Sequence, residues 1–125
     1  MSHKLMGQES KTTAIMQKFN DVFQLHDVKG LADIVADDCV VENTVPAPNG
    51  SRHVGKDACI ALWTQIATSP GTSFDLEAVE VFADRAVIFW RYRWGIGDAN
   101  SIRGVNLMRV RGGLIVEALG YVKGS

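Results

Sequence analysis

The feature that most constrains the fold of this chain is the alternation of apolar and polar residues from about residue 73 to residue 122. Because successive side chains of a strand point to opposite faces, such a run folds as a sheet that buries one face. Short turn sequences divide it into four segments of strand length: 73–82, 86–96, 101–111 and 114–122. The pattern predicts an antiparallel meander at the C-terminal end of the chain.

Residues before the meander show helical periodicity. In segment 12–25, apolar residues recur at three- and four-residue spacing, which predicts an amphipathic helix capped by Thr12 or Thr13. Residues 56–68 show the same pattern and end at a Ser-Pro-Gly sequence. Helices first and an antiparallel sheet last predict an α+β fold.

The segment between these two helices is less regular. A second, short helix is expected to begin at Asp27 and to end at Asp37 and Asp38, because apolar residues between them recur at helical spacing. Residues 39–45 alternate as a strand, and the following run, 46–51, has the Pro, Asn and Gly content typical of a loop.

A chain of 125 residues, 46% of them hydrophobic, is the size of one compact domain. We expect residues 1–11 to form a flexible polar leader and residues 12–125 to form that domain. The formal net charge of −1 provides no general attraction to nucleic acid or to an anionic membrane surface. Neither is therefore an expected partner.

Targeting and cysteine signals are also weak. The longest apolar runs, such as 86–90, are far shorter than the roughly 20 residues that span a bilayer. The N-terminal stretch lacks the apolar segment of a signal peptide, so a cytoplasmic protein is expected. Cys39 and Cys59 belong to no metal-binding or redox motif, which predicts that they are small buried hydrophobes.

Period-two alternation assigns one face of the last three strands to the interior. This set is almost entirely apolar: Ile88, Trp90, Tyr92, Trp94, Ile102, Gly104, Asn106, Met108, Val110, Val116, Ala118, Gly120 and Val122. Asn106 needs a hydrogen-bond partner, because an unpaired buried amide costs about 1–3 kcal/mol. Ala118 and Gly120 are small beside bulky aromatics, which leaves room for a cavity. Either a ligand occupies that space, or Phe19 and Trp63 of the helices fill it.

The opposite face of these strands combines charged groups with large apolar groups. Its members are Arg91, Arg93, Arg103, Arg109, Arg111, Glu117 and Lys123 together with Phe89, Val105, Leu107, Leu119 and Tyr121. A solvated sheet rarely presents so many large apolar side chains, so we expect a homodimer that pairs this outer face with its copy. The alternative is a solvent-exposed face on which the aliphatic parts of the arginine side chains cover the apolar groups.

Few of the expected pocket residues carry chemistry. Tyr92 points inward and offers a phenol that can donate to a ligand carbonyl, together with the amides of Asn43 and Asn106. His53, in the expected loop before the third helix, is the other candidate for catalysis. The acidic pair Asp37-Asp38 has too few companions to ligate a metal, so we expect neither a metal site nor a cofactor.

A family resemblance rests on the order of these elements and on three stretches, Ala36 to Asn43, Gly55 to Ala58 and Val105 to Tyr121. Over about residues 12–122 the chain resembles the nuclear-transport-factor-like superfamily, and within it the ketosteroid isomerase and SnoaL-like polyketide cyclase branch. The resemblance implies helices packed on a curved antiparallel sheet that forms a cone around an internal pocket, with the loop of His53 at its mouth. This superfamily hosts enzymes and binding domains alike.

The resemblance also assigns the positions of the isomerase's functional residues. Its proton-transferring aspartate corresponds to Asn43, its oxyanion-hole tyrosine to Phe19 and its protonated aspartate to Asn106. An amide cannot take up the proton and phenylalanine has no hydroxyl, so the family's catalytic groups are replaced. Asn43 also matches limonene epoxide hydrolase, whose last-strand acid corresponds to Gly120.

Three functions stay open. The favoured one is a homodimeric domain that binds a small, largely apolar molecule in a pocket lined by Phe19, Asn43, Trp63, Trp90, Tyr92, Asn106, Met108, Ala118 and Gly120. A second is an enzyme of isomerase, cyclase or epoxide hydrolase type with a non-standard site that includes Tyr92 or His53. A third is an interaction or oligomerisation module whose core is filled by its own side chains.

Overall fold

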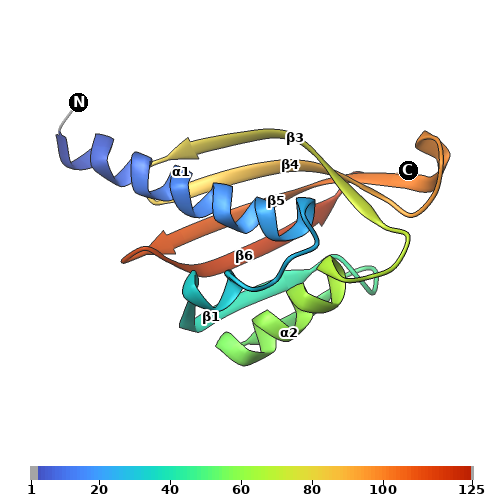
Figure 1. Cartoon of the computed structure of the whole chain (residues 1–125), viewed down its shortest axis with the longest axis horizontal. Helices are drawn as coiled ribbons and strands as arrows, with labels where there is room; N and C mark the ends of the chain where they lie inside the picture. The colour runs from blue at the N-terminus through green and yellow to red at the C-terminus, as the bar shows by residue number, and fades with distance from the viewer. Residues whose placement is uncertain (1–2, 125) are drawn as a thin grey trace.

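The computed structural model describes residues 3–124, and the side chains of residues 7–124. Its elements follow in chain order: α1 (His3–Gln24), η1 (Leu31–Asp33), β1 (Val35–Asn43), β2 (Ser51–Val54), α2 (Lys56–Ala67), β3 (Ser73–Phe82), β4 (Arg85–Arg93), η2 (Asp98–Asn100), β5 (Ser101–Arg111) and β6 (Leu114–Val122). Figure 1 shows both helices on one side of a curved sheet. α1 packs on β3 and β4, and α2 packs on β1 and β2. The predicted α+β class is confirmed.

The strands form one six-stranded mixed sheet in the order β2-β1-β6-β5-β4-β3. Four of its five neighbouring pairs are antiparallel. β1 and β6 run parallel, so the expectation of a wholly antiparallel sheet is wrong. No hairpin joins these two strands, because α2 and four other strands lie between them along the chain, and such a long connection permits parallel pairing.

α1 begins at His3, well before the predicted start at Thr12 or Thr13. Both threonine hydroxyls lie within hydrogen-bond distance of a carbonyl one turn earlier, Thr12 with Gln8 at 2.9 Å and Thr13 with Glu9 at 2.8 Å. This is the bonding of threonines inside a helix. Neither residue is therefore the predicted N-cap.

The first turns of α1 contact the turn between β3 and β4. The Thr12 hydroxyl lies 2.7 Å from the carbonyl oxygen of Ala83, and the Glu9 carboxylate accepts the N–H of the same residue at 3.2 Å. Residues 3–11, which were expected in the leader, are therefore part of α1. Met1 and Ser2 lie outside the described residues. Within residues 3–124, no helix is long and apolar enough to cross a membrane.

The predicted helix between Asp27 and Asp38 is wrong. The structure has only the short η1 turn there, and β1 begins at Val35. The N–H of Ile115 donates to the carbonyl of Ile34 at 2.7 Å, and Ile115 pairs with Val35. This long-range pairing overrides the local helical spacing. The Asp37 and Asp38 side chains lie exposed on β1.

Part of the predicted loop 46–51 and the residues after it form a strand. β2 pairs antiparallel with β1, so that His53 lies opposite Val41 and Ser51 opposite Asn43. The placement of His53 in a loop is therefore wrong. A four-residue strand between two glycines is too short to show a clear alternation.

A β-bulge changes the alternation at the start of β6. Arg109 pairs with Glu117, but the next residue, Val110, pairs with Ile115. The extra residue lets Ile115 and Val116 both face the core, at 0% and 5% exposure. Strict alternation had assigned only Val116 to the interior.

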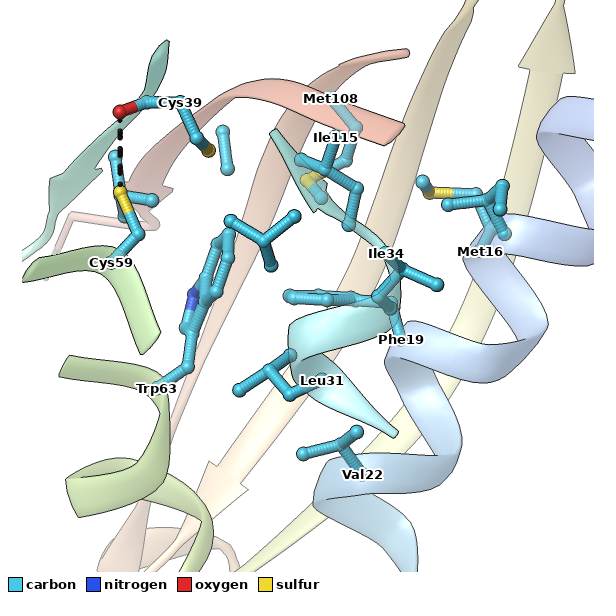
Figure 2. Packing of buried hydrophobic residues seen from close by; sticks show 14 of the residues in the cluster. Met16, Phe19, Val22, Leu31, Ile34, Cys39, Cys59, Trp63, Met108 and Ile115 are labelled. Carbon is cyan, nitrogen blue, oxygen red and sulfur yellow. Dashed lines mark hydrogen bonds between the residues drawn. The ribbon is translucent and has the colours of Figure 1, made fainter. Parts of the chain in front are cut away.

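The core packs between the helices and the sheet (Figure 2). Its most buried members include Met16, Phe19, Leu31, Ile34 and Ile115. Cys39 and Cys59 are both free and buried, and the Cys59 thiol donates to the Cys39 carbonyl at 3.4 Å. Burial raises the pKa of both thiols, so they behave as small hydrophobes, as predicted.

Candidate ligand-binding cavity

A cavity of about 550 Å³ lies beside this core, between the two helices and the inner face of the sheet. Its volume is within the roughly 300–1,000 Å³ range of small-molecule sites. Phe19 and Phe23 are among the wall residues from α1, and Trp63 is among those from α2. The rest of the wall comes from the sheet and from Thr44, Val45 and Ala47. Most of the wall is apolar.

The register of β4, β5 and β6 arranges the cavity floor in rows. Three rows follow one another from the closed end toward the mouth: Ile88-Asn106-Gly120, Trp90-Gly104-Val122 and Tyr92-Ile102. Ile88 in the first row is 2% exposed, whereas Trp94, just beyond the third row, is 50% exposed. The cavity therefore opens along the direction of β4.

Two glycines in these rows are required by close contacts. A Cβ on Gly104 would lie 2.5 Å from the ring of Trp90 and 2.5 Å from the carbonyl oxygen of Tyr121. A Cβ on Gly120 would lie 3.1 Å from the carbonyl oxygen of Glu42. Gly104 thus leaves room for the indole of Trp90 to lie across β5.

Asn106 is held in one orientation by its neighbour. The indole Nε1 of Trp90 donates a hydrogen bond to Asn106 Oδ1 at 3.2 Å. Because an indole N–H can only donate, the oxygen of the amide must face Trp90. The Asn106 Nδ2 group has no hydrogen-bond partner among the described residues, and Asn106 lines the cavity. The predicted need for a partner is met at the oxygen, and the N–H₂ group remains available as a donor.

Aromatic rings form a continuous wall along one side of the cavity. Phe19 contacts Trp63 and Phe23, with ring centroids 4.9 Å apart in both pairs. Phe74 of β3 continues the wall, with centroid distances of 5.6 Å to Phe23 and 4.8 Å to Tyr92. Edge-to-face pairs of this kind are stabilising beyond the area that they bury. Phe19 and Trp63 therefore form the wall without filling the cavity.

Eight of the nine residues that were predicted to line the pocket lie in the cavity wall: Phe19, Asn43, Trp63, Trp90, Tyr92, Asn106, Ala118 and Gly120. That they bind a ligand stays a prediction. Met108 is the exception, because it pairs with Ala86 and Ala118 beyond the closed end of the cavity and is 2% exposed. Figure 2 shows it beside Ile115 in the packed core.

Several wall residues were not singled out from the sequence. Asn20 and Gln24 of α1 line the cavity, and Gln24 Nε2 donates to the carbonyl of Phe74 at 2.7 Å. Their four-residue spacing places them on one side of the helix, which is the signal that identifies them. Phe74 and Leu76 of β3 alternate with exposed acidic residues, and this pattern also marks an inward face.

Titratable groups are scarce in this wall. Of the described wall residues, only Glu42 and Tyr92 titrate. The Glu42 carboxylate binds Arg52 at 3.0 Å on the outer side of the sheet, where Glu42 lies beside Leu119. The phenol of Tyr92 is therefore the one ionisable side chain that the described wall offers a ligand, and it is a weak acid.

His53 is remote from this chemistry. Its Nε2 lies 2.9 Å from the Ser51 hydroxyl on the edge strand β2, and neither residue lines the cavity. Among residues 7–124, no three His, Cys, Asp or Glu side chains gather in a way that would hold a metal ion.

Known proteins share this architecture. The SnoaL-like domain profile matches residues 16–118. The crystal structure of an NTF2-like protein of unknown function from Mesorhizobium loti is 60% identical in sequence and superposes with a TM-score of 0.87, covering 94% of this chain and 94% of that chain. A comparison with curated proteins finds no match.

Two more distant crystal structures have the same fold. A candidate polyketide cyclase from Sinorhizobium meliloti is 19% identical, with a TM-score of 0.71 over 86% of this chain and 94% of that chain. A candidate ketosteroid isomerase from Kribbella flavida is 17% identical, with a TM-score of 0.77 over 94% of this chain and 82% of that chain. With the profile matching most of its length, the chain belongs to the SnoaL-like domain family and has the NTF2-like fold.

Proposed function

We propose that this protein binds one small, largely apolar molecule that carries a hydrogen-bond acceptor, inside the cavity between the helices and the sheet. The observation that carries the proposal is the amide of Asn106. Trp90 occupies its oxygen, so its N–H₂ group is a donor in a mostly apolar wall. Because a hydrocarbon that covered this donor would leave it without a partner, at a cost of about 1–3 kcal/mol, a ligand oxygen at this position is favoured over a hydrocarbon.

The aromatic wall supports the same ligand class. The rings of Trp90 and Tyr92 follow one another from the closed end toward the mouth, and the ring of Phe74, opposite Tyr92 on β3, contacts both. Flat or extended apolar molecules pack well against such surfaces. The names of two structural neighbours, a polyketide cyclase and a ketosteroid isomerase, also refer to largely apolar molecules with carbonyl oxygens.

The wall favours binding over proton transfer. The amides of Asn43 and Asn106 cannot act as acids or bases at useful pH. A second candidate function is nevertheless an enzyme that uses Tyr92, because its phenol lines the cavity and has no hydrogen-bond partner among the described residues. Such an enzyme would lose turnover and keep ligand affinity in Tyr92→Phe.

Thermal unfolding with matched probes tests the binding proposal. We expect 2-acetylnaphthalene to raise the melting temperature more than 2-isopropenylnaphthalene, in which a CH₂ group replaces the carbonyl oxygen. Asn106→Leu should remove the difference, a change of about tenfold in relative affinity. Asn49→Ala, in the exposed loop, is the matched control and should behave as the wild type.

Native mass spectrometry of the gently purified protein provides an independent readout. An additional small mass on the folded protein would support the proposal and begin to identify the ligand. If no such mass is found, and if naphthyl ketones, steroids, terpenoids and polyketides all leave the melting temperature unchanged, the protein does not have this function.

We also propose that two copies associate through the outer face of the sheet. Leu107 and Tyr121 on this face are 40% and 54% exposed. Most of its arginines are paired with acids, as in Arg93–Asp75, Arg103–Glu77 and Arg111–Asp38. Among the described residues Arg109 differs, because its Nε is buried without a hydrogen-bond partner. A face of balanced charge meets its own copy without strong repulsion, and its apolar centre gains from burial. Light scattering should give a dimer at micromolar concentration and a monomer for Leu107→Glu, and a monomeric wild type would refute the interface.

A further inference from the structure

The cavity wall continues outward as an exposed apolar rim. Val45, Leu76, Trp94 and Val122 all line the cavity, yet they are 62%, 43%, 50% and 40% exposed. Single exposed apolar residues are ordinary on protein surfaces. Four of them from four separate segments, gathered at the mouth of one cavity, are typical of a binding surface.

The rim is continuous with the interior wall. Tyr92 contacts Trp94, with ring centroids 6.2 Å apart, and so extends the aromatic run out of the cavity. Ile88 and Trp94 are six positions apart along β4 and its extension, which is roughly 20 Å of extended chain. A compact molecule held at Asn106, in the row of Ile88, therefore leaves Trp94 uncovered. Leu76 and Val122 lie between these two ends, in the row of Trp90 and Gly104.

The turn that carries Trp94 is held in place before any ligand arrives. The N–H of Trp94 donates to the carbonyl of Asn100 at 3.1 Å. Arg93 donates to Asp75 at 2.7 Å and to Asp98 at 3.2 Å, which ties this turn to β3. A preformed surface loses little entropy on binding.

These ion pairs also disfavour one class of partner. The charges beside Trp94 are already balanced within the protein, since Arg93 lies between two carboxylates. An anionic membrane surface is attracted by clusters of unpaired basic residues, and the paired Arg93 does not supply one. The rim therefore fits an apolar group better than a charged surface.

We propose that Val45, Leu76, Trp94 and Val122 form an outer subsite that binds the apolar tail of the same ligand whose acceptor meets Asn106. The ligand is then an elongated molecule, with an oxygen acceptor near one end and a hydrocarbon tail longer than the enclosed part of the cavity. This inference rests on the proposed function and adds the shape of the ligand to it.

The test is a series of methyl ketones from 2-hexanone to 2-tridecanone, with dissociation constants measured by calorimetry. In the wild type, we expect affinity to rise about fourfold for each methylene through the whole series, since one buried methylene contributes about 0.8 kcal/mol. In the double variant Leu76→Ser/Trp94→Ser, 2-hexanone should bind as in the wild type. The rise should stop at tails that leave the enclosed cavity, so that 2-tridecanone binds at least tenfold more weakly than to the wild type.

Ile96→Ser is the matched control. Ile96 is 96% exposed in the same turn and does not line the cavity, so this variant should reproduce the whole wild-type series. Parallel series in the wild type and the double variant would overturn the outer subsite and leave the proposed function standing. If no ketone of any length binds the wild type, the proposed function and the subsite fail together.

Two further measurements identify other occupants of the rim. Co-sedimentation of the wild type, but not of the double variant, with phosphatidylcholine vesicles would assign the rim to a membrane surface. A change of subunit number in the double variant would assign it to a second copy of the chain. Either result, combined with parallel ketone series, overturns the proposal.

Discussion

The two faces of β4, β5 and β6 differ in how their polar groups are satisfied. On the outer face, charged groups are paired repeatedly, as where Glu77 binds Arg103 at 2.8 Å and lies 4.0 Å from Arg91. On the inner face, the amide of Asn106 has one partner, Trp90, and a free N–H₂ group. Water can complete the bonding of the exposed charges outside, although the Nε of Arg109 on that face is buried without a partner among the described residues. The Asn106 N–H₂ group belongs to the cavity wall, and an apolar ligand that covered it would leave it unpaired. The comparison teaches that the donor on the inner face, rather than the crowded charges outside, points to a ligand with an acceptor.

The largest expected effect comes from a substitution at Gly104 on the inner face. In Gly104→Ala, the new Cβ would lie 2.5 Å from the Trp90 ring and from a backbone carbonyl that cannot move freely. We expect the free energy of unfolding in urea to fall by about 1–3 kcal/mol. Gly7→Ala is the control, because nothing lies within 4 Å of its Cβ in α1, and it should be neutral or stabilising. Equal stability of the two variants would show that Trp90 does not lie across β5.

A smaller effect is expected from removing the hydrogen bond between Trp90 and Asn106 on the inner face. Trp90→Phe and Asn106→Leu should each lower the free energy of unfolding by about 1 kcal/mol, since each removes one partner of that bond. The double variant should lose less than the sum, with a coupling of about 0.5–1 kcal/mol in a double-mutant cycle. Strict additivity would mean that the bond is absent in solution and that the orientation of Asn106 is not fixed.

The smallest effect is expected from the exposed ion pair between Arg111 and Asp38 on the outer face. Arg111 donates to Asp38 at 2.8 Å and holds the pKa of this carboxyl below its ordinary value of 3.8. A lowered folded pKa stabilises the protein above the ordinary value, and this contribution disappears as the pH falls through the lowered value. In Arg111→Gln, an NMR titration of Asp38 should show a pKa raised from its wild-type value, because the largest cause of the lowering is removed. Arg93→Gln, which contacts other acids, should leave that titration unchanged.

Local alternation was sufficient to predict most of the C-terminal sheet. The predicted segments 73–82, 101–111 and 114–122 agree with β3, β5 and β6, because turns between them are short and one face is buried throughout. Segment 86–96 extends too far, since residues after Arg93 leave β4 to form the turn with η2. The strand β1 was cut short at its start, because its pairing with Ile115 depends on a residue that is distant in the sequence.

The sequence was sufficient to predict which face of the sheet carries the site, but not which rows of that face the cavity reaches. Alternation identifies which side of a strand looks inward, so Trp90, Tyr92 and Asn106 were correctly placed on the inner face. It cannot tell how far along the strand the cavity extends. Met108 was therefore included, although helix α1 and the core close the cavity before it, and Trp94 at the mouth was left out.

The position of β6 in the sheet has a consequence for how the protein is made. β6 is the last strand along the chain, yet it lies between β1 and β5 and supplies Ala118 and Gly120 to the cavity floor (Figure 1). Until residue 122 has left the ribosome, the β1–β2 pair has no neighbour, and the aromatic face of β4 and β5 has no complete floor. Contacts between such distant parts of a chain form slowly and leave apolar surface exposed meanwhile. The nascent protein therefore carries an incomplete pocket through most of its synthesis. During this period, a chaperone or an early-bound ligand would cover the most exposed apolar surface.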